Sequence, residues 1–243
     1  MSFRDARWAP LLGVFLWSCL ASPGVAAVEP PPSDEAAATG ALEAELLLLR
    51  GDAIKTEPSF SPEEGGHAYA IDLVKQVVNL NRGIYMDEDL MGVTPTDFCI
   101  GIAGYPEKHF EAMNLEDDLY HLKKKVEAGA DYIVTQMFFD NKKYFDFVSS
   151  CRAMGITVPI IPGLKPLKTL NHISFIPKYF HIDYPVELSR MLIKCKTNAD
   201  VERVGIEWGI HQSKELKAAG VPCIHYYTMS NSSSVKAIAA EVF

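Results

Sequence analysis

The chain has 243 residues, 48% of them hydrophobic, and a formal net charge of −8. The acidic balance argues against a nucleic-acid-binding protein, which needs a basic face. The five cysteines include neither a Cys-x-x-Cys pair nor a zinc-like spacing with histidine, so we expect no metal site. Buried thiols at Cys99 and Cys223 fit a reducing, cytoplasmic location.

The first 44 residues differ in composition from the rest of the chain. Residues 1–27 resemble a secretory signal, with Arg4 and Arg7 before an apolar core at 11–20 and the small residues Val25-Ala26-Ala27 after it. The apolar core is too short to span a membrane. Residues 28–44 are rich in Pro and Ala and predict a linker. We interpret residues 1–27 as signal-like or misjoined, with export as the minority alternative, and residues 45–243 as the folded domain.

Beyond residue 45, five short apolar runs each end in small or polar residues. Such runs, alternating with helical patterns, predict parallel strands joined by crossover helices. Parallel strand ends that face one way are how a (β/α) barrel builds an active site. The runs and their endings are 46–49 before Arg50-Gly51-Asp52, 98–103 before Gly104-Tyr105-Pro106, 132–134 before Thr135-Gln136, 158–161 before Pro162-Gly163, and 223–225 before Tyr226-Tyr227-Thr228.

The predicted helices lie between these runs. One covers about 115–128, with Asn114 as its cap and Gly129 at its end. Others cover about 142–154 and 199–219, and a further helix begins at Tyr69 and Ala70. The segment 81–97 predicts a long surface loop. The apolar face of the helix predicted over 115–128 carries Leu115, Leu119, Leu122 and Val126.

A complete (β/α)8 TIM barrel takes roughly 250 residues and eight strand–helix units. Because only five units are recognisable, the sequence predicts an α/β fold that is an incomplete TIM barrel, without its first three strands. An open doubly wound sheet is the rival architecture. No Gly-x-Gly-x-x-Gly follows any predicted strand, so a Rossmann site is not supported.

Seven motifs occur in an order that resembles the methylenetetrahydrofolate reductase family, from about residue 46 to the end of the chain. Any one of them is a weak signal, whereas the ordered set is specific. The motifs are Leu49-Arg50-Gly51-Asp52, Glu64-Gly65-Gly66 with Tyr69-Ala70-x-Asp72-Leu73-Val74, Ala103-Gly104-Tyr105-Pro106-Glu107-x-His109, Asp118-x-x-His121-Leu122-Lys123-x-Lys125, Thr135-Gln136-x-Phe138-Phe139, Pro162-Gly163, and His225-x-Tyr227-Thr228.

The resemblance implies a flavoenzyme of one-carbon and methionine metabolism. FAD would lie across the carboxyl ends of the strands, NADH or NADPH would reduce it, and 5,10-methylenetetrahydrofolate would be reduced to 5-methyltetrahydrofolate. The implied partners are these small molecules and further copies of the chain in a homo-oligomer, with no nucleic acid and no membrane. A non-catalytic flavin- or folate-binding module of the same family and an exported binding protein remain as alternatives.

The resemblance also implies roles for particular residues. Asp52 would be catalytic, because a carboxylate there disfavours negative charge on the reduced flavin and stabilises the cationic iminium form of the folate. Asp52, Gln136 and Tyr227 would bind the substrate. The implied cofactor-binding residues are Arg50, Gly51, Asp52, Tyr69, Ala70, Tyr105, His109, Ala112, Asp118, His121 and Lys125.

Residue spacing gives one independent reason for part of this set. Asp118, His121 and Lys125 are three and four residues apart, which places them on one face of the predicted helix. Lys125 would meet the phosphates of the cofactor and Asp118 its hydroxyls. An intrahelical salt bridge is the alternative interpretation.

The chain departs from the family pattern at two places. The motif bearing the general-acid glutamate is absent, and Glu29, Glu43 and Glu45 stand in no matching context. After Thr228 the family commonly has a basic residue for the glutamate tail of the folate, whereas this chain reads Met-Ser-Asn-Ser at 229–232. His172 stands at a loop position where a nicotinamide contact falls.

Overall fold

The structure is a computed structural model, and it describes residues 44–50, 60–87, 89–228 and 232–243. Gly51 and Asp52, and the segments 1–27 and 28–43, lie outside the described residues. Within the described part, no helix combines the length and apolar character needed to cross a bilayer.

Parallel strands form the centre of the fold. β1 (Ala44–Leu48), β2 (Phe98–Gly104), β3 (Tyr132–Thr135) and β4 (Ile160–Ile161) make a sheet in that order, and β5 (Gly163–Leu164) pairs with β6 (His225–Tyr226). Only Pro162 separates β4 from β5, so one stretch of chain takes part in both sheets. All pairs are parallel, which confirms the predicted α/β class with a parallel sheet.

The five predicted strands therefore all exist, as consecutive parallel segments in chain order. The run 158–161 narrows to β4 and continues as β5 beyond Pro162, and the run 223–225 shifts to 225–226. Proline has no backbone N–H to donate to a ladder, which explains the interruption. Among the described residues, β1 pairs only with β2 and β6 only with β5, so these strands form an open arc.

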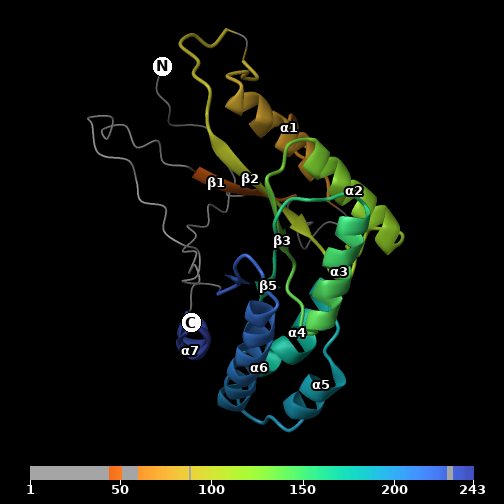
Figure 1. Ribbon diagram of the computed structural model, residues 1–243, viewed down its shortest axis with the longest axis vertical. Coiled ribbons are helices and arrows are strands. Elements are labelled where there is room, and N and C mark those ends of the chain that lie inside the picture. Colours follow the sequence, from red (N-terminus) through yellow and green to blue (C-terminus); the bar gives the residue numbers. More distant parts are fainter. Residues whose placement is uncertain (1–43, 51–59, 88, 229–231) are drawn as a thin grey trace, which may run out of the picture.

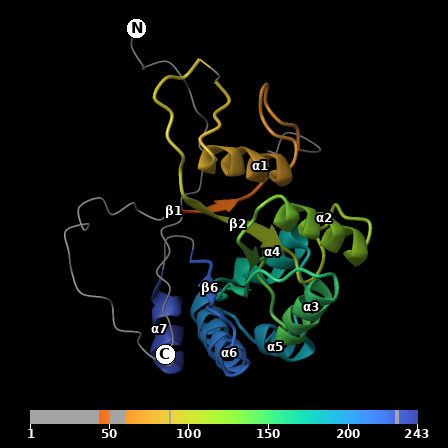
Figure 2. The ribbon, with the colours of Figure 1, turned by 45° about the horizontal axis from the view of Figure 1, so that its top comes forward.

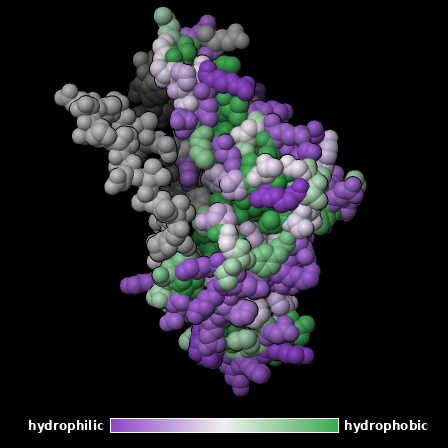
Figure 3. All heavy atoms as spheres, viewed as in Figure 1, coloured by the Kyte–Doolittle hydropathy of each residue, from purple (hydrophilic) through white to green (hydrophobic). Residues whose placement is uncertain are grey.

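Helices cover one face of this arc. α1 (Ala70–Asn81), α2 (Leu115–Glu127) and α3 (Asn141–Ala153) lie side by side on the same face of the four-stranded sheet (Figure 1). α6 (Asn198–Ala218) and α7 (Ser233–Val242) lie next to each other beside β6 (Figure 2). Hydrophilic side chains cover most of the lower part of the face in Figure 3, over α6 and α5 (Val186–Leu192).

Three helices escaped the sequence reasoning, namely α4 (Leu170–Phe180), α5 and α7. α4 contains Pro177 and buries only Ile176 fully, and α5 has just seven residues. A proline inside a helical pattern indicates a helix end, and seven residues are too few to show a clear helical period. The predicted cap of α2 is confirmed, because the Asn114 side chain accepts a hydrogen bond from the Asp117 N–H at 2.8 Å.

The outer face of the sheet carries the larger core. Ile100, Ile102 and Ile133 are at most 1% exposed and pack beneath Leu122 and Phe147 of the helices. Full burial of one such side chain stabilises the fold by about 1.5–3 kcal/mol. Leu115, expected on the buried face of α2, is instead 40% exposed at the first turn of the helix.

The inner face of the sheet carries a smaller cluster of Tyr132, Val134 and Ile161, with Leu47, Cys99 and Cys223 packed against it. Gly101 makes room for the Tyr132 ring, since a Cβ there would lie 2.3 Å from the ring Cζ. Cys99 and Cys223 were expected to be buried in strands; both are only half-buried, and Cys223 precedes β6 because that strand begins at His225.

Candidate active site

Polar side chains follow the carboxyl ends of the strands along one edge of the arc. Tyr105 comes directly after β2, Gln136 after β3, Lys165 after β5 and Tyr227 after β6. Side chains two residues apart on a strand share a face. Because Val134 lies in the inner-face cluster, Gln136 also lies on the inner side of the arc. Parallel strands thus bring these groups to one edge, as the sequence predicted for Tyr105, Gln136 and Tyr227 but not for Lys165.

Tyr227 is fixed in place across this edge. Its hydroxyl donates to the Thr135 carbonyl oxygen at 2.8 Å, and its ring passes over Gly163. A Cβ at Gly163 would lie 2.2 Å from the Thr135 oxygen and 2.7 Å from Tyr227 Cε2, so only glycine permits this approach. Burial raises the pKa of the Tyr227 hydroxyl, which keeps it neutral. Tyr227 therefore forms one wall of the site.

Gln136 keeps one half of its amide available. Its backbone N–H donates to the Gly104 carbonyl oxygen at 2.8 Å, and its Oε1 accepts from the Met137 N–H at 3.0 Å. The structure gives Nε2 no hydrogen-bond partner among the described residues. An amide with a satisfied acceptor and an open donor is suited to a ligand that accepts a hydrogen bond.

α2 holds the end of β2 and the segment after it through two side chains. Lys125 Nζ donates to the Ala103 carbonyl oxygen at 3.0 Å, and Asp118 Oδ2 accepts from the His109 N–H at 2.8 Å. Burial lowers the pKa of the Lys125 ammonium, and the charge of Asp118 opposes that shift. The predicted common face of α2 therefore brings Asp118 and Lys125 to the edge of the sheet.

His121, the third member of that predicted face, lies elsewhere. Its side chain is 66% exposed, and its Nε2 lies 3.7 Å from Asp117 Oδ1. The structure therefore does not bring His121 together with the other predicted cofactor-binding residues.

His109 and Tyr105 meet edge to face, with ring centroids 4.6 Å apart. Burial lowers the pKa of His109, and its Nδ1 accepts from the Glu111 N–H at 3.2 Å. The neutral ring therefore carries its proton on Nε2. Glu111 also pairs with Arg50 at 2.5 Å, which ties the end of β1 to the same segment.

The remaining residues predicted to bind the cofactor lie at the margin of the candidate site. Tyr69 is 64% exposed at the start of α1, and Ala70 is half-buried beside it. The Ala112 carbonyl oxygen accepts from Lys108 Nζ at 2.6 Å, inside the loop that follows β2. No group of three or more potential metal-ligating side chains occurs in the described ranges.

Sequence reasoning gave no role to Glu107, which joins three segments of the chain. Its contacts with Lys143 and Asp183 form what we call the clasp. Lys143 of α3 contacts Glu107 and lies 3.0 Å from Asp183, whose N–H donates to Glu107 Oε2 at 3.2 Å. Glu107 Oε1 is buried without a hydrogen-bond partner. Burial raises the pKa of Glu107 although Lys143 opposes the shift. The clasp fixes the loop after β2 against the connection between α4 and α5.

Lys165 was also missed, although a lysine two residues after the Pro162-Gly163 motif was a visible signal. It is half-buried, and its Nζ donates to the Tyr227 carbonyl oxygen at 2.9 Å. The edge therefore combines aromatic rings, an open amide donor and two half-buried ammonium groups, Lys125 and Lys165. Such a set is suited to a planar, partly anionic ligand.

Known proteins resemble this chain over most of its length. The family model for methylenetetrahydrofolate reductase matches residues 34–242. Methylenetetrahydrofolate reductase 1 of Schizosaccharomyces pombe is 35% identical over 194 residues, which is 79% of this chain and 30% of that protein. Methylenetetrahydrofolate reductase (NADH) 1 of Zea mays is 36% identical over 199 residues, 78% of this chain and 31% of that protein.

A bacterial relative is shorter. The 5,10-methylenetetrahydrofolate reductase of Pectobacterium carotovorum is 31% identical over 196 residues, 79% of this chain and 58% of that protein. An uncharacterized protein from Clostridium thermocellum, solved with two copies of 5-methyl-5,6,7,8-tetrahydrofolic acid, aligns with a TM-score of 0.43 and 21% identity over 60% of this chain and 52% of that chain. The chain thus spans about a third of the eukaryotic relatives and 58% of the bacterial one.

Proposed function

Because the chain belongs to the methylenetetrahydrofolate reductase family, we propose that it binds FAD and reduces 5,10-methylenetetrahydrofolate to 5-methyltetrahydrofolate with NADH or NADPH. Its relatives carry the name of that oxidoreductase activity. The described arc is proposed to be part of a (β/α)8 barrel. The single observation that carries the proposal is the meeting of Tyr105, Gln136 and Tyr227, together with Lys125, at the carboxyl edge of parallel strands in a chain of this family.

The residues at this edge fit a flavin dinucleotide. Lys125 offers a half-buried ammonium whose pKa burial has lowered, and a phosphate beside it would stabilise its charged form. Tyr105 and His109 present ring edges and faces to a planar group. When bound, FAD supplies hydride transfer through its ring system.

The residues of the chain position the reactants and exclude water. Gln136 Nε2 donates to an acceptor on the substrate ring, and Tyr227, held by the Thr135 carbonyl, closes the side of the site along β6. Asp52, on the segment beyond β1, is proposed to stabilise positive charge that develops on the folate. Tyr69, Ala70 and Ala112 are proposed to contact outer parts of the cofactor.

A binding module without turnover is the second candidate. It is favoured by the strand pairing, because β1 and β6 each keep an edge without a strand partner among the described residues. A flavin site that lacks part of its wall binds its ligand without completing catalysis. Retained flavin with no folate reduction would identify this case.

The visible absorption spectrum of the purified full-length chain tests the proposal. Bound flavin that bleaches on anaerobic addition of NADH or NADPH, and recovers on addition of methylenetetrahydrofolate, supports the reductase. In Asp52→Asn, bleaching should persist while folate reduction falls. A colourless protein that takes up no added FAD would contradict the proposal.

A further inference from the structure

Lys165 differs from two other lysines near the carboxyl edge, because those two form ion pairs. Lys143 contacts the carboxylates of Glu107 and Asp183, and Lys168 Nζ lies 3.4 Å from Glu202 Oε1. Among the described residues, the printed partner of Lys165 Nζ is a neutral carbonyl oxygen, that of Tyr227. A half-buried charge without a counter-ion is costly unless an anion approaches it.

Two more basic groups stand close to Lys165. Burial lowers the pKa of Lys165, and the charge of Lys168 lowers it further. Burial also lowers the pKa of His172, and both lysines add to that shift. His172 Nδ1 accepts from the Lys168 N–H at 3.2 Å, so its neutral ring keeps a donor on Nε2. Lys168 Nζ forms an ion pair with Glu202 and donates a hydrogen bond to the Ser233 hydroxyl. Among the described residues, no carboxylate forms an ion pair with Lys165.

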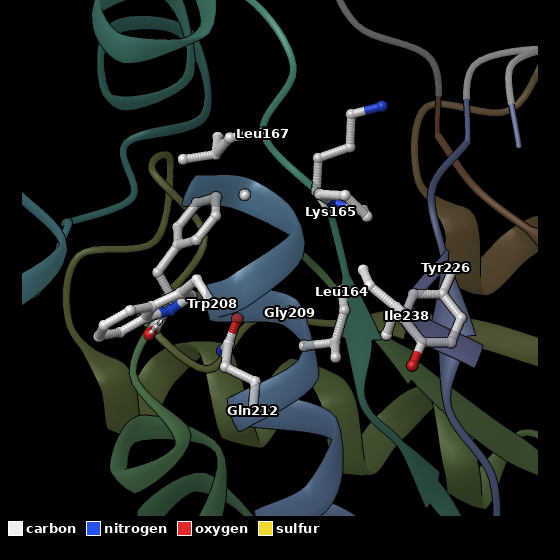
Figure 4. A pocket seen from close by; sticks show the side chains of 11 residues that line it. Leu164, Lys165, Leu167, Trp208, Gly209, Gln212, Tyr226 and Ile238 are labelled. Atoms are coloured by element: carbon white, nitrogen blue, oxygen red, sulfur yellow. Dashed lines mark hydrogen bonds between the residues drawn. The ribbon is translucent and has the colours of Figure 1, made fainter. Parts of the chain in front are cut away.

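The direction of Lys165 places this charge on the ligand side of the strand. In Figure 4 its side chain extends away from Trp208 and Gln212, which belong to α6. Its ammonium reaches the carbonyl of Tyr227, where the chain leaves β6. Tyr227 in turn bonds to Thr135, the neighbour of Gln136. Lys165 therefore stands at one end of the proposed site.

We propose that Lys165, supported by Lys168 and His172, forms an anion subsite that binds the acidic end of a substrate, a carboxylate or a phosphate. The inference rests on the proposed function and deepens it. The carboxylate source is the glutamate of the folate, and the phosphate source is the nicotinamide dinucleotide. The chain has no basic side chain between Thr228 and Lys236, so a cation for an acidic tail near the end of β6 has to come from another strand.

Binding to purified full-length variants tests the subsite. Isothermal titration compares Lys165→Met, Lys165→Arg and the exposed control Lys214→Met with three ligands: 5-methyltetrahydrofolate, the matching pteroate without glutamate, and NADH. Loss of one charge-assisted hydrogen bond should weaken binding about tenfold to hundredfold in Lys165→Met. Lys165→Arg should retain most of the affinity, and Lys214→Met all of it.

The pattern of losses identifies the source of the anion. Weakened 5-methyltetrahydrofolate with unchanged pteroate supports the carboxylate, and weakened NADH supports the phosphate. Unchanged affinity for all three ligands, or equal weakening of the pteroate and the folate, overturns the subsite. Lys165→Gln serves as the second variant if the methionine variant does not fold.

A separate outcome concerns the proposed function itself. If the unaltered chain binds neither folate nor NADH, the proposed function fails, and inorganic pyrophosphate then tests the subsite alone. Thermal stabilisation by pyrophosphate that disappears in Lys165→Met supports the subsite. Absence of stabilisation in the unaltered chain overturns it.

Discussion

The outer face of the sheet and its carboxyl edge are built in opposite ways. On the outer face, aliphatic and aromatic side chains such as Ile133 and Phe147 are at most 2% exposed. Among the described residues at the carboxyl edge, Lys125 and Lys165 donate to carbonyl oxygens alone, and Glu107 Oε1 is buried with no hydrogen-bond partner. The outer face is therefore optimised for stability, whereas the edge keeps polar capacity that the fold itself does not use.

The largest effect is expected on the outer face, which we infer to be the main source of stability. Phe147→Ala should lower the free energy of unfolding by about 3–5 kcal/mol, because it leaves a cavity between α3 and the sheet. Urea unfolding followed by circular dichroism measures this change. Tyr179→Ala, at a side chain that is 58% exposed, is the control and should stay within about 0.5 kcal/mol. Equal losses in both variants would contradict the contrast.

At the carboxyl edge, a substitution should change ligand affinity more than stability. Lys125→Met keeps the length of the side chain and removes a charge that burial already disfavours, so the free energy of unfolding should change by at most about 1 kcal/mol. Flavin affinity should fall about tenfold or more, because the proposed phosphate contact is lost. Titration of the apoprotein with FAD measures this. A large loss of stability with unchanged flavin affinity would assign Lys125 to the core.

The pH dependence of stability sharpens the comparison at Glu107. Burial raises its folded-state pKa above the ordinary value of 4.5, so folding favours the protonated carboxyl. That contribution is fully present below the ordinary pKa and is lost as the pH rises through the folded-state pKa. Glu107→Gln should remove this part of the decline. Urea unfolding at several pH values tests it, and identical slopes would refute the assignment.

His121 provides the smallest expected effect. Its side chain is 66% exposed near Asp117, and an exposed pair of this kind contributes little. His121→Ala should change the unfolding free energy by less than about 0.5 kcal/mol and flavin affinity by less than about twofold. A tenfold loss of flavin affinity would instead support the cofactor role implied by the family resemblance.

The features that sequence reasoning found are those with a local signature. The apolar run before Gly104 predicts β2, and Asn114 with Asp117 predicts the start of α2. Helical spacing predicted a common face for Asp118, His121 and Lys125, and the structure brings Asp118 and Lys125 to the end of β2 but leaves His121 apart. The ordered motifs led to the family because they recur in one order along the chain, at strand ends and in α1 and α2.

The missed features depend on contacts that are distant in sequence. The clasp joins Glu107 to Asp183, 76 residues away. Lys165 donates a hydrogen bond to Tyr227, 62 residues away. Neither pair has a periodicity that could reveal it. α4 was missed for a different reason, since Pro177 inside the helix reads as a helix breaker.

Pro162 has a consequence for the dynamics of the arc. Because it lacks an N–H, it interrupts the hydrogen-bonded ladder where the four-stranded sheet passes into the β5–β6 pair. Cooperative opening units often coincide with such boundaries. Amide hydrogen exchange should therefore separate β2 and β3, with slow exchange, from the N–H groups of His225 and Tyr227, which exchange faster. The wall of the site would then open and close while the sheet behind it stays intact.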